Sequence, residues 1–429
     1  MLSRVAVLLV LVSVVSHAAP NLEVHEWGTF TSIAGADGRA VPWQATSEDL
    51  PSFVYSNHFS CAGLRSCVAM EQSKSRMRAL IRMETPVIYF YTPEPLDVSL
   101  QVAFPTGRMT EWYPSAWNST ATLLDWGTFR VDPTQRPKLP AEAAPNHYYA
   151  AREVDAAPVL VTGQRFVEGG PGCTEREVEF EAGRKTRMCL TSTPTKEWER
   201  FLFYRGVGDF HPPLQAVVSK TEVTVTPTEK LGTAILFERR GNALGITSFD
   251  ARAGRQSVNR PALTATPEAI RQTVFELLVA TGLFEKEARA MVKTWDDSWF
   301  VEGVRIFYVV PSARTAALLP LTISPAPKRL VRTIVGRLEL LMPEQLAAVR
   351  AELERLVRPP GLAKVVTNSE NNSEERMRAI EVLAGALHTK FGRFLPVMLS
   401  RLSEDATDER ASLYRELSSR LDARAASLE

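Results

Sequence analysis

Two neighbouring stretches, PVIYFY at residues 86–91 and DVSLQVAF at residues 97–104, decide the fold class of the chain. The first is a continuous run of strand-forming apolar residues, which predicts a central strand buried on both faces. The second alternates apolar and polar residues, and this period of two predicts a strand with one face in a core. The turn signal at 105–107 predicts that 108–113 returns beside it as the partner strand.

The same pattern of short strands and turns continues, so we expect a β-rich body over residues 22–260. Segments 177–181 and 184–187 carry opposite charges on the two sides of a turn, which predicts a hairpin with cross-strand ion pairs. Segments 221–226 and 233–238 are the candidate strands of another hairpin. Repeated short strands of this kind favour a sandwich of two sheets.

The pattern changes after residue 260. The TPE sequence at 266–268 has the residue types of a helix start: an N-cap residue, a proline at the first helical position and an acid in the first turn. A second helix is expected at 284–294. Strands are expected again at 303–310 and 334–341, because these segments are rich in branched apolar residues.

These elements together predict an α+β fold. A β-sandwich-like N-terminal body occupies residues 22–260, a helix pair plus strands at 262–342 packs on that body, and a helical C-terminal region fills 343–429. The chain has 429 residues, and a chain of this length buries a sizeable core without help from metals or many disulfides.

The charge balance restricts the class of partner. Lysine and arginine together number 50, and aspartate and glutamate together number 49. The chain therefore lacks the broad cationic surface with which a general nucleic-acid binder neutralises phosphates, and nucleic acid is excluded as a partner. The aromatic-rich strands favour an envelope component or a carbohydrate as the ligand.

The N-terminus has the three parts of a secretory signal. Arg4 gives a positive start, residues 5–15 form an apolar run, and Ser-His-Ala at 16–18 supplies small residues for cleavage. We predict a signal peptide at 1–18 and export to the periplasm or the extracellular space. The best later apolar stretch, 304–321, contains two arginines, so we expect no transmembrane span.

The four cysteines favour disulfides, because their number is even and the chain is expected to be exported. The local pairing of Cys61 with Cys67 and of Cys173 with Cys189 is the simplest of the three connectivities. A four-cysteine zinc site is the alternative, but neither pair has the Cys-X-X-Cys spacing that such sites favour. We therefore predict two short-range disulfides.

One candidate site is a metal centre. The segment HEWGTFT at 25–31 begins with His25, and FYRGVGDFHPP at 203–213 contains Asp209 and His211 in alternation. Residues two apart on an extended chain share a face, and an Asp-X-His pair is able to ligate a metal. We take His25, Asp209 and His211 as candidate ligands of a divalent metal. The alternative is a satisfied polar edge for the histidine and a glycine-rich turn for the aspartate. No motif predicts another cofactor.

The second candidate site is a pair of carboxylates. Glu84 precedes the apolar run within RMETPVIYFY at 82–91, and Glu111 lies between threonine and tryptophan within TEWYP at 110–114. If the two segments are neighbouring strands, the two acids form a candidate acid/base pair. An ordinary strand-end ion pair between Arg82 and Glu84, and an aromatic packing cluster around Glu111, are the structural alternatives.

Seven motifs occur in a fixed order along the chain. They are HEWGTFT, RMETPVIYFY, TEWYP, FLFYRGVG (201–208), EKEARAMVKTWDDSWF (285–300), GVRIFYVVP (303–311) and LPLTISPAPKRLVRTIVGRLELL (319–341). As a set they resemble a family of secreted hypothetical proteins from myxobacteria and planctomycetes, over most of residues 24–345. The resemblance implies bacterial export and supplies no mechanism or site.

Two classes of function follow from these observations. The first is an exported, non-catalytic binding or envelope-associated protein, which the aromatic-rich strands, the near-zero net charge and the absence of a nucleophile motif in the sequence favour. The second is an exported hydrolase that uses either the Glu84–Glu111 pair or the metal site. The positions of these side chains in the folded chain distinguish the two.

Overall fold

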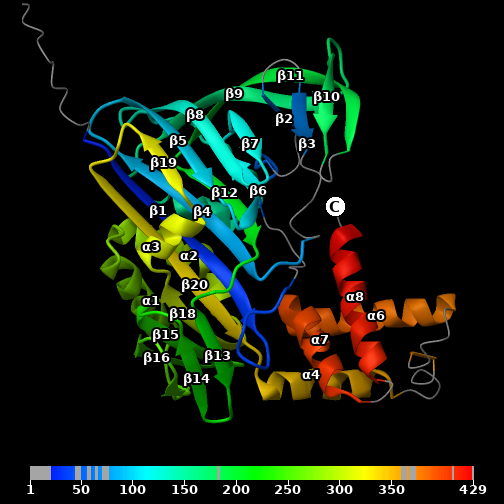
Figure 1. Ribbon diagram of the computed structural model, residues 1–429. Helices are drawn as coiled ribbons and strands as arrows, with labels where there is room; N and C mark the ends of the chain where they lie inside the picture. The colour runs from blue at the N-terminus through cyan, green and yellow to red at the C-terminus, as the bar shows by residue number, and fades with distance from the viewer. Residues whose placement is uncertain are drawn as a thin grey trace, which may run out of the picture.

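The computed structural model shows two packed β-sheets with helices against one of them, and a separate group of helices beside this body (Figure 1). The architecture is α+β and sandwich-like, as predicted. The segment predicted to be a signal peptide, 1–18, lies outside the described residues. The structure describes residues 21–43, 50–55, 59–62, 66–69, 77–180, 184–358, 365–366, 373–407 and 410–427.

The first sheet has eight strands, and these include both the first and the last strand of the chain, β1 and β20. Its central pair, β1 and β20, is parallel, and the other pairs are antiparallel. In spatial order the strands are β16 (Ala243–Ala251), β15 (Gly232–Arg240), β18 (Gly303–Val309), β20 (Arg329–Leu340), β1 (Glu23–Ala34), β4 (Ile81–Tyr91), β12 (Leu202–Gly208) and β6 (Gly107–Tyr113).

The expected boundary near residue 260 needs correction. We predicted that the strands of 262–342 pack on the body, but β18 and β20 lie inside its eight-stranded sheet, next to β1. Both strands are buried along most of their length, so they complete the sheet rather than cover it. The helix pair of this region packs on the body from outside, as predicted.

The second sheet has nine strands, and β7 (Asn118–Thr120) joins it beside β8. A smaller three-stranded sheet consists of β13 (Leu214–Val218), β14 (Glu222–Pro227) and β17 (Gln256–Asn259). In spatial order the other eight strands of the second sheet are β19 (Leu321–Ser324), β5 (Leu96–Ala103), β8 (Leu123–Val131), β9 (Val159–Glu168), β11 (Lys185–Glu199), β10 (Thr174–Glu179), β3 (Ser66–Ala69) and β2 (Phe59–Ala62).

The two stretches that decided the fold class lie in opposite sheets of the sandwich. β4 is a central strand of the first sheet, and the alternating residues Val98, Leu100 and Val102 of β5 are buried, as predicted. Aromatic contacts join the sheets: the ring centroids of Phe90 and Phe129 lie 5.3 Å apart. Burial of these faces from water is the main stabilising contribution to the body.

Two predicted strand pairings are wrong. The turn at 105–107 is present, but β6 crosses into the first sheet and pairs with β12, while β5 pairs with β8 and β19. Likewise β14 pairs with β13 and β17, whereas β15 pairs with β16 and β18. In both cases the strands change layers at the turn, and a period-two pattern is the same for either partner.

The helix pair covers one face of the first sheet. α1 (Pro267–Ala280) begins as predicted: the hydroxyl of Thr266 accepts a hydrogen bond from the Ala269 amide. α2 (Glu285–Trp299) follows, and its Trp299 ring lies 5.2 Å from the Phe307 ring of β18. The short helix η2 (His147–Arg152) packs beside α2. Another short helix, α3 (Ser312–Leu318), connects β18 to β19.

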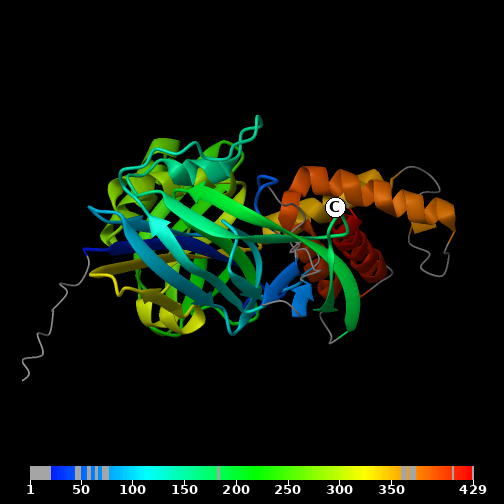
Figure 2. The same ribbon diagram turned by 90° about the horizontal axis from the view of Figure 1, so that it is seen from above.

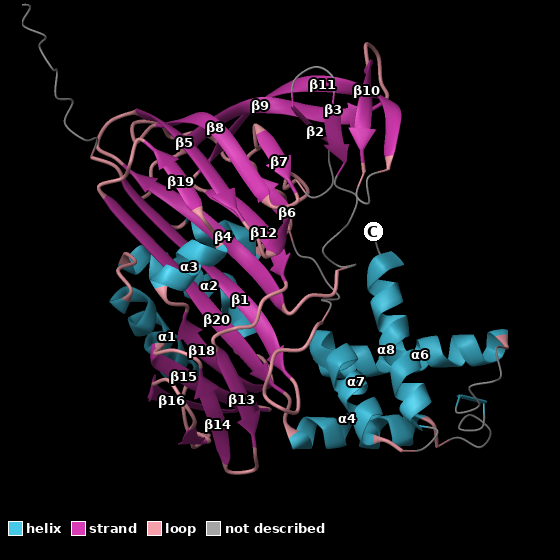
Figure 3. Cartoon of the chain, viewed as in Figure 1, coloured by secondary structure: helices cyan, strands magenta, loops and turns pink. Residues whose placement is uncertain are grey.

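The C-terminal region is helical, as predicted, and has its own core (Figure 3). Two residues of the body, Ile33 and Trp43, belong to this second core. The centroids of the Trp43 and Phe394 rings lie 5.7 Å apart. The elements are α4 (Pro343–Leu356), α6 (Glu374–Phe391), η4 (Gly392–Phe394), α7 (Leu395–Asp405) and α8 (Arg410–Ser427).

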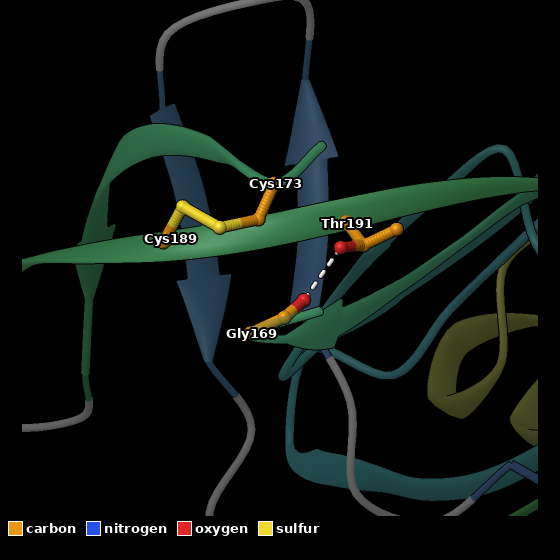
Figure 4. The surroundings of a disulfide bond; sticks show 4 residues. All are labelled: Gly169, Cys173, Cys189 and Thr191. Atoms are coloured by element: carbon orange, nitrogen blue, oxygen red, sulfur yellow. Dashed lines mark hydrogen bonds between the residues drawn. A yellow bond between two sulfur atoms is a disulfide. The ribbon is translucent and has the colours of Figure 1, made fainter. Parts of the chain in front are cut away.

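The far ends of β9 and β11 form an arm with β10, β3 and β2. The arm extends beyond the body toward the side of the C-terminal helices (Figures 1 and 2). A disulfide joins Cys173 and Cys189 within it, and the Thr191 hydroxyl donates to the Gly169 carbonyl nearby (Figure 4). Cys67 is also disulfide-bonded and lies opposite Cys61 in the β2–β3 register. The predicted charge pairs of the hairpin are present, with Lys185 near two glutamates.

The arm's small core makes its stability depend on the disulfide. Cys173 and Cys189 are 16 residues apart, and closing a loop of this length restricts the unfolded state by about 3 kcal/mol. We expect the Cys173→Ser/Cys189→Ser variant to speed amide hydrogen exchange in the distal parts of β9, β10 and β11. Exchange in β1, β4 and β20 serves as the internal control and stays slow. Unchanged exchange in the arm contradicts this expectation.

Candidate ligand-binding cleft

A cleft of about 1150 Å³ lies between the body and the C-terminal helices. Its floor is formed by β4 and β12, which contribute Arg82, Glu84 and Arg205. One wall consists of η2 and α2. The other wall consists of α4, the end of α6, η4 and the start of α7. The cleft is therefore lined by segments that are far apart in the sequence.

Buried polar side chains form a band across the sheet beneath this cleft. The band follows the strand pairs, in which Arg305 faces Glu339, Arg337 faces Thr31, and Arg205 faces Glu111. Side chains that face one another in a register project from the same face of a sheet. In spatial order the members are Arg305 on β18, Glu339 and Arg337 on β20, Thr31 on β1, Arg82 and Glu84 on β4, Arg205 on β12 and Glu111 on β6, and all are buried.

A β-bulge in β4 places Arg82 and Glu84 on this face. Trp27 pairs with Val87, but Thr29 pairs with Glu84, so β4 has one extra residue between these two pairs. An extra residue reverses which side chains point to which face of the sheet. Opposite the bulge lies Gly28, where an added Cβ would lie 2.9 Å from the Cα of Pro86. Glycine is needed there because the bulged backbone approaches closely.

Glu84 connects the floor to the C-terminal helices. It accepts a hydrogen bond from the Thr31 hydroxyl at 2.8 Å, and its other oxygen lies 3.2 Å from Nη1 of Arg393 on η4. The same oxygen lies 3.6 Å from Nε of Arg82. Both guanidinium groups also lie over the Trp43 ring, at 5.5 and 5.9 Å from its centroid. One carboxylate is thus shared by two arginines from opposite sides of the cleft.

A second shared carboxylate lies deeper in the same band. Glu339 accepts hydrogen bonds from Nε of Arg305 at 2.8 Å and from Nε of Arg337 at 2.5 Å. Burial raises the pKa of Glu339, but the two guanidinium groups outweigh burial and hold this pKa below its ordinary value. Burial lowers the pKa of Arg337 to about 10, with Glu339 opposing that change.

Arg337 and Arg393 have donor nitrogens that remain unused within the described part of the chain. Nη1 and Nη2 of Arg337 and Nη2 of Arg393 are buried and make no hydrogen bond to any described residue. Both guanidinium groups lie within 6 Å of the Phe394 ring centroid. Buried donors are nearly always satisfied in folded proteins, and of these two arginines Arg393 lines the cleft, where it is able to donate to a further acceptor.

The wall formed by η2 and α2 is polar and aromatic. Nε2 of His147 lies 3.3 Å from a terminal nitrogen of Arg205, and the His147 ring lies 5.8 Å from the Trp295 ring. Lys293 on the same wall forms an ion pair with Glu153. The opposite wall is mixed. Met342, Ala348, Phe391, Phe394 and Met398 form an apolar patch on it, beside Glu344, Gln345, Thr389 and Lys390. The cleft therefore has an arginine-rich floor and an apolar patch on one of its two walls.

The two carboxylates predicted as a pair do not both reach the cleft. Glu84 lies on β4 and Glu111 on β6, with β12 between them, so they are not on adjacent strands. Glu84 lines the cleft. Glu111 is 1 % exposed, is absent from the cleft lining, and accepts a hydrogen bond from the Thr110 hydroxyl at 2.5 Å. Of the predicted pair, only Glu84 therefore lies against the cleft.

His25 lies on β1, beside the end of β4 that is away from the cleft. Its Nδ1 lies 2.7 Å from Glu287 of α2 and its Nε2 lies 2.8 Å from Glu23. The ring is buried beside Tyr91 and Phe284. Two carboxylates satisfy both ring nitrogens, so this histidine joins β1 to the start of α2. This environment matches the alternative to a metal ligand, in which the histidine belongs to a satisfied polar edge.

Asp209 and His211 lie in the exposed loop after β12. That loop follows the pairing of Gly208 with Ile81, whereas His25 pairs with Tyr89 at the opposite end of β4. Eight residues of strand span roughly 27 Å, so the structure does not bring the three proposed ligands together. Among the described residues, no group of three His, Cys, Asp or Glu is placed to hold a metal ion.

Sequence reasoning missed Arg337, Arg393 and His147. Arg393 and His147 come from helical segments far apart in the chain, and no local pattern indicates that they meet. Arg337 could have been recognised from the sequence, because it lies within the apolar strand segment TIVGRLELL, residues 333–341. A charged residue at an inward position of a buried strand needs a partner, so it marks an internal polar cluster.

Comparison with protein-family models, with curated proteins and with solved structures finds no match. Within the described ranges, no helix is both long enough and apolar enough to span a membrane.

Glu339 offers a direct test of the buried band. We expect Glu339→Gln to lower the free energy of unfolding by about 3–5 kcal/mol at pH 7, because two buried guanidinium groups lose their counter-charge. The pKa of Glu339 is lower in the folded state, so its contribution is full above the ordinary value of 4.5 and is lost as pH falls through the folded value. Urea unfolding at pH 7 and below pH 4 measures both effects.

The matched control is Glu404→Gln, which removes an exposed carboxylate paired with Arg401 on α7. It should change the urea midpoint little, because exposed ion pairs contribute little to stability. If Glu339→Gln unfolds at the same urea concentration as the unchanged protein, the band does not depend on its shared carboxylates.

Proposed function

We propose that the protein is an exported binding protein and that its cleft binds a small organic anion. The observation that carries the proposal is the set of guanidinium groups at the cleft floor. Arg82 on β4, Arg205 on β12 and Arg393 on η4 all line the same cleft. Arginine forks are well suited to carboxylate and phosphate oxygens, and they act more strongly where water is partly excluded.

The unused donors support an anion rather than a neutral ligand. Nη2 of Arg393 makes no hydrogen bond to a described residue, and the Glu84 carboxylate beside it is already shared with Arg82. A ligand oxyanion supplies acceptors to such a cluster and offsets its positive charge. A neutral ligand supplies acceptors alone.

The size and lining of the cleft support an organic ligand. A volume of about 1150 Å³ exceeds what an inorganic ion occupies and is typical of clefts that hold organic molecules. The apolar patch on the wall formed by the C-terminal helices, with Met342, Phe391 and Met398, suits the carbon body of such a ligand.

Binding is favoured over hydrolysis by the position of Glu111. Acid/base hydrolysis by two carboxylates needs both of them to flank the bond that breaks. Glu111 is enclosed within the sheet and hydrogen-bonded to Thr110, whereas Glu84 is held by Thr31 and two arginines. The arrangement supports a site that holds a ligand in place.

Export is supported by the predicted signal at 1–18 and by the disulfide between Cys173 and Cys189. Disulfides persist in oxidising compartments such as the periplasm and the extracellular space. The proposed membership of the secreted myxobacterial and planctomycete family fits the same location. An envelope component or a released carbohydrate acid is the kind of ligand available there.

The proposal predicts preferential binding of anions to the mature chain, residues 19–429. Calorimetric titration compares benzoate, glucuronate and phenyl phosphate with the neutral analogues benzyl alcohol and glucose. We expect at least one anion to bind and its neutral analogue not to bind. Arg393→Met should weaken the anion by about tenfold or more, because it removes a charge-assisted hydrogen-bond donor from the floor.

Arg401→Met is the matched control. Arg401 lies on α7 of the same helical region and pairs with Glu404 and Asp405, away from the cleft lining. It should leave the affinity unchanged. Equal binding of anions and neutral analogues, or full affinity in Arg393→Met, would show that this cleft is not an anion site.

A further inference from the structure

We infer that the acidic group recognised in the cleft is a dianionic phosphoryl group, carried as a monoester on an organic body. The inference rests on the proposed binding of an anion and names its chemical class. Three observations support it. The guanidinium groups approach from different directions, Glu84 and Glu339 are each shared by two arginines, and the cleft has room for an organic body.

The guanidinium groups approach from three separate elements. Arg82 and Arg205 lie on the neighbouring strands β4 and β12. Arg393 lies on η4, on the wall of the cleft, and contacts Glu84 of the floor. A carboxylate has two oxygens in one plane, so the acceptor positions that it offers lie close to that plane. A phosphoryl group has three acceptor oxygens that point in different directions, so it is able to engage donors from three elements at once.

The charge of the cluster favours two negative charges over one. Glu84 serves both Arg82 and Arg393, and Glu339 serves both Arg305 and Arg337. Arg337 is fully buried directly behind Phe394 and adds to the positive potential at the floor. In a partly buried site the attraction grows with the charge of the ligand, so a dianion gains more than a monoanion.

The rest of the cleft fits the organic part of a monoester. Inorganic phosphate would fill a small share of the volume and would leave the apolar patch at Phe391 and Met398 uncovered. On the facing wall, Asn146, His147 and Thr294 contribute polar groups to the cleft lining. They are placed to contact the ester oxygen or neighbouring hydroxyl groups of the ligand.

Three phenyl compounds with the same ring test the inference by calorimetry on the mature chain. Phenyl phosphate is a dianion at pH 7.5 and loses one charge with a pKa of about 6. Phenyl sulfate is tetrahedral but carries one charge at both pH values, and benzoate is planar with one charge. At pH 7.5 we expect phenyl phosphate to bind at least tenfold more tightly than either of the other two.

The pH dependence separates the charge of the ligand from that of the protein. Between pH 7.5 and pH 5 the dianion fraction of phenyl phosphate falls to roughly a tenth, so its affinity should fall about tenfold relative to phenyl sulfate. Phenyl sulfate serves as the reference because its own charge stays constant, so its affinity reports what the charged lining contributes at each pH; that lining includes Glu84, His147, Glu153, Lys293, Asp297, Glu302, Glu344 and Lys390. A constant ratio of the two affinities overturns the inference.

A substitution at Glu84 gives a second readout. Glu84→Gln keeps an acceptor for the Thr31 hydroxyl but removes the charge that competes with the ligand for Arg82 and Arg393. We expect it to tighten phenyl phosphate severalfold and to tighten benzoate less. A weaker phenyl phosphate complex in a variant with an unchanged circular dichroism spectrum contradicts the inference.

The outcomes distinguish this inference from the proposed function. If benzoate and phenyl phosphate bind equally well and Arg393→Met weakens both, the proposed anion site stands and the phosphoryl inference is rejected. Binding of none of the three compounds rejects both. Preferential binding of phenyl phosphate, with the expected loss at pH 5, supports both.

Discussion

The β-bulge in β4, opposite Gly28 of β1, is the constraint on which the arrangement of the cleft depends. Above the bulge, Val87 and Tyr89 face the helix pair, and below it Arg82 and Glu84 take over that face. Without the extra residue these two charged side chains would point into the apolar core between the sheets, where unpaired charges are prohibitively costly. The bulge therefore lets one face of this strand contact helices at one end and form a polar floor at the other.

The C-terminal helices depend on that floor. They have their own core, and the body adds Ile33 and Trp43 to it. At the same junction Arg393 contacts Glu84 and lies over Trp43. Because the ligand-facing groups come from both sides of this junction, an anion in the cleft would contact the body and the helices together. Clefts between such regions are common places for ligand binding.

The sequence predicts the types of the elements better than their partners. The apolar run before Tyr91, the alternation of β5 and the start of α1 at Thr266 are local patterns, and each was confirmed. Pairings such as β6 with β12 depend on which layer a strand enters after its turn, and the local pattern is the same for both layers. The bulge could be predicted only in part. A proline inside a central strand indicates an irregularity, but it does not indicate the face to which Glu84 points.

The most direct test of the account is hydrogen–deuterium exchange of the mature chain with and without saturating phenyl phosphate. The account predicts slower exchange in two separate segments, residues 81–86 on the floor and 389–398 on the helical side, because the ligand contacts both. Protection restricted to one of these segments would contradict a cleft that closes on its ligand from both sides. Protection elsewhere alone, for example in the arm of β9–β11, would place the ligand at a different site.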